Sequence, residues 1–108
     1  MNSPTGSSTR EYEIYLPSTQ HDGEPVDAGE LARIKEILVN AFGGYTQLNH
    51  GSEGVWKTGD GPLRDEITII RVLDNGYSDF DMTSFKKFLE TKLMQQNVLI
   101  VSREIKTI

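Results

Sequence analysis

One glycine-rich stretch of the sequence holds the side chains best suited to bind a ligand. It runs from residue 41 to residue 66 and reads AFGGYTQLNHGSEGVWKTGDGPLRDE. Its aromatic rings could stack on a planar ligand, and its guanidinium and imidazole groups could contact an anion. Loops this long are uncommon in small domains, and those that occur are usually functional or mobile. We predict a binding site where a loop over 45–66 meets the sheet or a subunit boundary, lined by Tyr45, Thr46, His50, Trp56 and Arg64.

Three of these residues also have purely structural interpretations. His50 is followed three residues later by Glu53, a spacing that suits a general base, but a solvated loop residue is the simpler interpretation. Trp56 is the only Trp of the chain and could anchor the loop instead of stacking on a ligand. Arg64 stands among acidic residues and equally fits the charged start of a strand.

Sequence signatures of catalysis are missing. The chain has no GxxxxGK[ST] phosphate loop, no GxGxxG after a strand and no GxSxG nucleophile elbow. It has two His and no Cys, which makes a closed zinc site improbable. We therefore expect no catalytic residue, no metal and no cofactor, and we favour a non-enzymatic protein.

Composition bounds the partners and the compartment. The formal net charge is −5 and the eleven Lys and Arg residues are scattered, which disfavours nucleic-acid binding. No apolar run approaches the roughly 18 residues that span a bilayer, and the N-terminal residues lack the apolar segment of a secretory signal. With no cysteine to form disulfides, we expect a cytoplasmic protein without membrane contact.

Periodicity predicts a single α+β domain over residues 11–108, preceded by a disordered tail over 1–10. The first helix is predicted to begin at Asp27, which with Glu30 has the spacing of a capping box. It is predicted to end at Gly43-Gly44. The other predicted elements are strands at 11–16, 64–73 and 98–105, strand pieces at 45–49 and 54–57, a turn at 60–62, and a helix from 81 or 83 to 95. This β-α-β-β-α-β order is ferredoxin-like, with two helices on a four-stranded antiparallel sheet.

The later strands predict a covering partner. Residues 67–73 and 98–101 are apolar on both faces, whereas a two-layer sheet should bury only one face. Exposed apolar patches mark interaction sites, so we expect a homo-dimer or a higher oligomer. The alternative is that the predicted 45–66 loop folds over the sheet and covers these residues within one chain.

The chain also resembles small bacterial and phage proteins of a domain-of-unknown-function family. The residues that carry the resemblance are Leu16-Pro17, Asp22-Gly23, Phe42-Gly43-Gly44-Tyr45-Thr46, Gly54-Val55-Trp56 and Asp65-Glu66. The shared pattern, LP…DG…FGGxT…GxW…DE, spans most of residues 12–105. The resemblance supports the fold and adds no mechanism.

Three functional hypotheses follow. The first is an oligomeric binding or regulatory module for a small anionic ligand, such as a nucleotide or a metabolite. The alternative is an acidic protein-interaction or inhibitor factor, which the charge and the double-sided strands suit equally well. The third is a small enzyme that uses His50 with Glu53 or Asp65.

Overall fold

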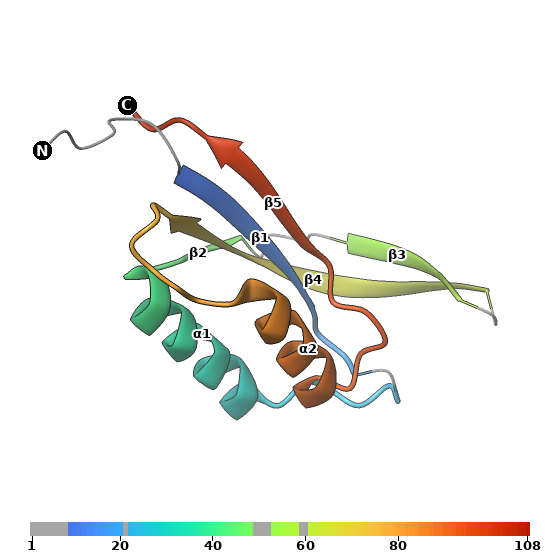
Figure 1. The fold of residues 1–108 in the computed structure, drawn as a ribbon. Coiled ribbons are helices and arrows are strands. Elements are labelled where there is room, and N and C mark those ends of the chain that lie inside the picture. Colours follow the sequence, from blue (N-terminus) through green and yellow to red (C-terminus); the bar gives the residue numbers. More distant parts are fainter. Residues whose placement is uncertain (1–8, 21, 49–52, 59–60) are drawn as a thin grey trace, which may run out of the picture.

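The described residues fold as an α+β structure of five strands and two helices (Figure 1). The computed structural model describes residues 9–20, 22–48, 53–58 and 61–108, with the backbone alone described for 53–58 and 61–66. The elements are β1 (Thr9–Pro17), α1 (Ala28–Phe42), β2 (Thr46–Leu48), β3 (Glu53–Thr58), β4 (Gly61–Asp74), α2 (Met82–Lys92) and β5 (Ile100–Ile105).

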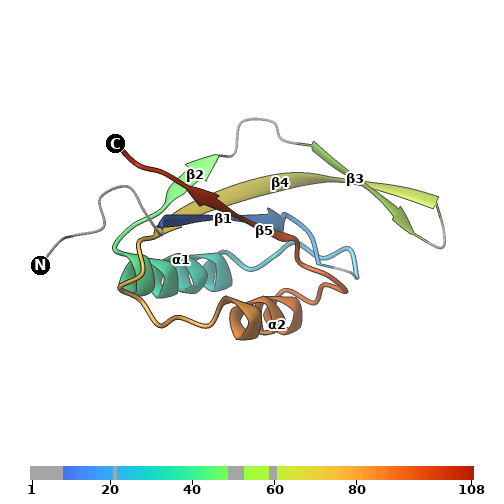
Figure 2. The ribbon, with the colours of Figure 1, turned by 45° about the horizontal axis from the view of Figure 1, so that its top comes forward.

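The sheet has the strand order β2-β4-β1-β5, with every pair antiparallel, and β3 pairs with the first part of β4. Both helices lie on the same face of the sheet (Figure 2). We call the opposite face the open face. Since β2 and β3 are two pieces of the predicted second strand, the arrangement confirms the predicted ferredoxin-like fold.

The core lies between the helices and the sheet. Ile34 and Leu38 of α1 and Leu89 of α2 are fully buried against Ile14 and Ile70 of the sheet. These residues fall at alternate positions of β1 and on one stripe of each helix, as burial of one face requires. The remaining buried members of the same cluster are Leu16, Val72, Phe85, Leu93 and Val98.

The ends of α1 are set by two local signals. The Asp27 carboxylate accepts a hydrogen bond from the Gly29 backbone N–H at 3.1 Å, and the Gly43 N–H donates to the Val39 carbonyl at 2.8 Å. Gly43 has φ +85°, the left-handed conformation that glycine adopts readily. Both predicted helix ends are confirmed. Oε2 of Glu30 is buried without a hydrogen-bond partner and does not complete the reciprocal half of the capping box.

A glycine comparison tests this helix end. We expect Gly43→Ala to lower the free energy of unfolding by about 1 kcal/mol, because alanine is strained at positive φ. A Cβ atom added at Gly43 or at Gly44 would meet no atom within 4 Å, and only Gly43 of the two has positive φ. Gly44→Ala is therefore the control and should be close to neutral in urea unfolding. Equal losses in the two variants would contradict a backbone origin.

Some element boundaries differ from the prediction. Thr9 and Arg10, which are predicted to belong to the N-terminal tail, are the first residues of β1, while residues 1–8 lie outside the described part. The second helix ends at Lys92 instead of residue 95, and Met94 has φ +50°, which stops a helix. β5 begins at Ile100 instead of residue 98.

The predicted 45–66 loop is wrong, because most of this segment is β structure. β3 pairs with β4 in register from Glu53↔Glu66 to Thr58↔Gly61, so only residues 59 and 60 connect the two strands. The predicted turn at 60–62 is therefore wrong for residues 61 and 62, which belong to β4, and residue 60 lies outside the described part. We call β3 with residues 61–66 of β4 the arm.

The arm extends beyond the two-layer body (Figures 1 and 2). The principal-axis extents of the molecule are 55 × 24 × 24 Å. On β4, residues 67 and 68 separate the part that pairs with β2 from the part that pairs with β3. Of the described part of the 45–66 segment, β2 is thus a strand of the sheet, and the arm extends beyond the sheet and does not fold over the open face.

Candidate functional site

A hollow of about 520 Å³ lies where α1 passes into β2, at one end of the sheet. Two of the residues predicted for the site, Tyr45 and Thr46, line it. The remaining lining residues are Glu11, Phe42, Gly43, Gly44, Arg71, Val72, Leu73 and Ile105. The hollow therefore joins a helix end to three strands that are distant in sequence.

The end of α1 positions the wall of this hollow. After Gly43 reverses the chain direction, Phe42 remains on the core side, with its ring 5.3 Å from that of Phe80. Tyr45 is left 39% exposed. Thr46 starts β2 and pairs with Arg71 of β4. The helix end thus places an aromatic ring and a hydroxyl next to a guanidinium-bearing strand.

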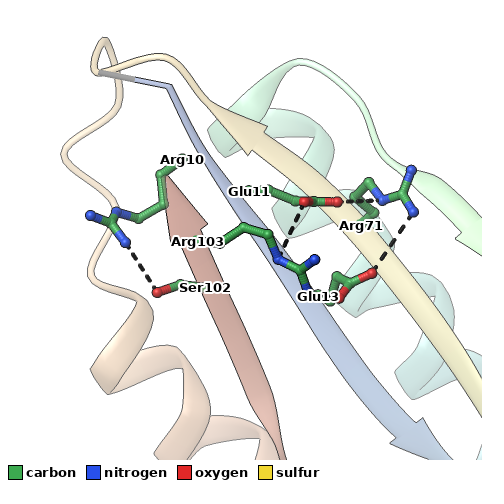
Figure 3. A network of polar contacts seen from close by, with 6 residues as sticks. All are labelled: Arg10, Glu11, Glu13, Arg71, Ser102 and Arg103. Atoms are coloured by element: carbon green, nitrogen blue, oxygen red, sulfur yellow. Dashed lines mark hydrogen bonds and ion pairs between the residues drawn. The ribbon is translucent and has the colours of Figure 1, made fainter. Parts of the chain in front are cut away.

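Four charged residues form a network on the open face (Figure 3). Glu11 and Glu13 of the central strand β1 lie between Arg71 of β4 and Arg103 of β5. Arg71 Nε lies 2.7 Å from a Glu11 oxygen, and Arg103 Nη2 donates to a Glu13 oxygen at 2.7 Å. The two longer ion pairs are Arg71–Glu13 at 3.8 Å and Arg103–Glu11 at 3.6 Å.

Arg71 is held in this network mainly by charge. Its Nε is at ion-pair distance from Glu11 but has no hydrogen-bond partner, and its Nη2 is too far from Glu13 for a hydrogen bond. Its side chain is 40% exposed, whereas those of Glu11 and Glu13 are 12% and 13% exposed. Because Arg71 also lines the hollow, its guanidinium is the positive group best placed to meet a ligand there.

The other predicted site residues lie elsewhere. Trp56 and Arg64 belong to the arm, where the backbone of Trp56 pairs with Leu63 and that of Arg64 with Val55, and their side chains lie outside the described part. His50 lies outside the described residues. The structure thus brings together Tyr45 and Thr46 and adds Arg71 and Glu11, which sequence reasoning missed. The available signal was the alternation of β1, which puts both Glu residues on the face opposite the core.

The described residues offer neither a candidate metal site nor a membrane span. Within the described ranges no group of three or more His, Cys, Asp or Glu residues could hold a metal ion. No helix in that part of the chain is long and apolar enough to cross a membrane.

No family model, curated protein or solved structure matches this chain. The resemblance to the bacterial and phage family therefore stays a prediction, and the functional argument depends on the geometry of the site.

Proposed function

We propose that this protein is a non-enzymatic binding module that takes a small anionic ligand in the hollow at the α1–β2 junction. The observation that carries the proposal is Arg71, which lines the hollow with a side chain that is 40% exposed. Guanidinium groups bind carboxylates and phosphates through paired N–H donors. Because Arg71 Nε is buried beside Glu11, the terminal Nη groups of Arg71 would donate to the ligand.

The rest of the hollow suits the body of such a ligand. Its volume of about 520 Å³ lies within the range of small-molecule sites. Apolar side chains from three elements, Phe42, Leu73 and Ile105, can contact a ring or a chain, and Tyr45 can stack on a planar group. Glu11 on the same wall repels additional negative charge. The site therefore favours a ligand with one terminal carboxylate or phosphate over a polyanion.

Ligand screening with an arginine variant tests the proposal. We expect the melting temperature to rise with at least one member of a panel of nucleotides and carboxylate metabolites, because a ligand that binds the folded state stabilises it. Arg71→Met should weaken binding of that compound about tenfold or more, because a charge-assisted hydrogen bond contributes about that much to affinity.

Arg10→Met is the matched control for this variant. Arg10 is also on the sheet, where it donates to the Ser102 hydroxyl at 3.2 Å, but it does not line the hollow. Its removal should leave affinity unchanged. A panel without any shift in the wild-type protein would reject the ligand proposal, and equal losses in both variants would reject Arg71 as the contact.

A protein-interaction factor is the second candidate, and the arm favours it. A two-stranded hairpin is marginally stable by itself, so an extended arm suits contact with another protein. A protomer that captures one specific partner, with capture lost when residues 53–66 are replaced by a short linker, would support this candidate. In either case we propose a cytoplasmic location, in line with the absence of cysteine from the sequence.

A further inference from the structure

The charges on the open face are arranged so that two copies of the face complement each other. The strand register places open-face residues of β4, β1 and β5 next to one another in rows across the sheet. In the order β4, β1, β5, one row is Leu73–Glu11–Arg103 and the adjacent row is Arg71–Glu13–Val101. Acidic residues therefore occupy the central strand, with one arginine on each flanking strand (Figure 3).

We propose that a second copy of this chain covers the open face, packed face to face about a two-fold axis that runs parallel to the strands between β1 and β4. Such an axis lays β1 of one copy over β4 of the other. Glu13 then lies opposite Arg71 of the second copy, and by symmetry Arg71 lies opposite Glu13 of the second copy. The next row pairs Ile69 with Tyr15 of the second copy in the same reciprocal way.

The charge balance of the chain favours a second copy at this place. The chain carries a net charge of −5, so two copies repel each other in most relative orientations. The four-residue network holds two arginines and two glutamates and is therefore neutral, which makes the open face a region of weak repulsion. Glu11 and Glu13 are already mostly buried within one protomer, so covering them adds little desolvation cost.

Apolar side chains around the network supply the remaining contact. Leu73 is 46% exposed and Leu99 is 39% exposed. The main sheet has four strands spaced about 4.8 Å apart, and β1–β5 pairing covers six residues at about 3.4 Å each. The footprint of roughly 400 Å² is small for a protein interface. We therefore expect a reversible dimer with micromolar affinity.

The second copy would also extend the proposed ligand site. The same axis places β5 of one copy over β2 of the other, which brings Arg103 of the second copy toward the hollow. Arg103 is 52% exposed, so its guanidinium can turn outward. This part of the inference rests on the proposed function, whereas the dimer itself does not, since it needs no ligand.

Reciprocal charge reversal tests the interface without any ligand. Wild-type protein should sediment with twice the protomer mass at tens of micromolar. Glu13→Arg and Arg71→Glu should each raise the dimer dissociation constant at least about tenfold, because each creates two like-charge contacts across the axis. An equimolar mixture of the two variants should restore the dimer, because both contacts between unlike variants are attractive.

Further variants keep the test decisive. Arg33→Glu makes the same change of charge as Arg71→Glu at an exposed position of α1 and should leave the dimer intact. If a reversal variant fails to fold, Val101→Lys replaces it, since this half-buried open-face residue lies beside Glu13 and its lysine should give a folded monomer. A wild-type protein that stays monomeric, or folded variants that stay monomeric when mixed, would overturn the proposal.

Discussion

Replacing Leu38 with alanine will lower the free energy of unfolding by about 2–5 kcal/mol, the range for deleting a buried leucine side chain. Leu38 is fully buried on the core-facing side of α1, in the same cluster as Ile34 and Ile70. Its removal forfeits apolar burial and leaves a cavity that the surrounding residues fill only in part. The total free energy of unfolding of a typical domain is about 5–15 kcal/mol. Urea unfolding should therefore show a large shift of the midpoint.

The adjacent residue provides the control. Val39 is 41% exposed on the outer side of α1. Val39→Ala removes less apolar contact and improves helix propensity, so its effect should stay within about 0.5 kcal/mol. Similar losses for the two variants would contradict the orientation of α1 on the sheet.

Replacing Lys86 with methionine will disconnect α2 from the segment that leads into β5. Lys86 Nζ donates to Glu90 Oε2 at 2.6 Å, to Asn97 Oδ1 at 2.7 Å and to the Val98 carbonyl at 2.6 Å. Lys86 therefore connects Glu90 on the same helix to the residues that follow the helix. Because the side chain is 35% exposed, we expect a moderate loss of about 1–2 kcal/mol in thermal or urea unfolding.

Lys87→Met is the matched control, since Lys87 is the exposed neighbour on the same helix. It should change stability little. If Lys87→Met lowers the free energy of unfolding as much as Lys86→Met does, the positive charge of α2 stabilises the fold, and the contacts of Lys86 to Asn97 and Val98 do not.

The same contacts predict a dependence of stability on pH. The pKa of Glu90 is lowered from its ordinary value of 4.5, first by the hydrogen bond from Lys86 and then by the Val98 N–H. A lowered pKa stabilises the folded state above the ordinary value, and this stabilisation is lost as pH falls through the folded-state pKa. Unfolding measured from neutral pH to about pH 3 should show a smaller loss in Lys86→Met than in the wild type.

Local signals were sufficient to predict the helices and the order of the elements. Asp27 and Gly43 mark the ends of α1 through hydrogen bonds within a few residues, so their effect can be seen in the sequence. Strand pieces at 54–57 and 64–73 with a turn between them were predicted, but their pairing was not, because the glycines of 51–61 are compatible with both a loop and a tight connection. Only the pairing of Glu53 with Glu66 distinguishes the two.

The charge network of the open face could not be predicted, because it depends on register between distant segments. Arg103 and Glu13 are 90 residues apart in sequence, and Arg71 stands within a run that the sequence identifies only as a strand. Tyr45 and Thr46 were found because they follow the helix end directly. A site residue is thus predictable here when a local element positions it, and it is missed when strand pairing positions it.

The pairing of β1 has a consequence for the order in which the protein folds. β1 lies between β4 and β5, both of which come from the second half of the chain. Even the nearest pair in sequence between β1 and β4, Pro17 with Ile67, is 50 residues apart. Pairing β1 with β4 or β5 therefore closes a long loop, and its entropic cost delays these pairings to a late stage of folding. During synthesis on the ribosome, Ile14 and Leu16 therefore stay exposed until β4 emerges, and this interval is when the chain most needs protection from aggregation.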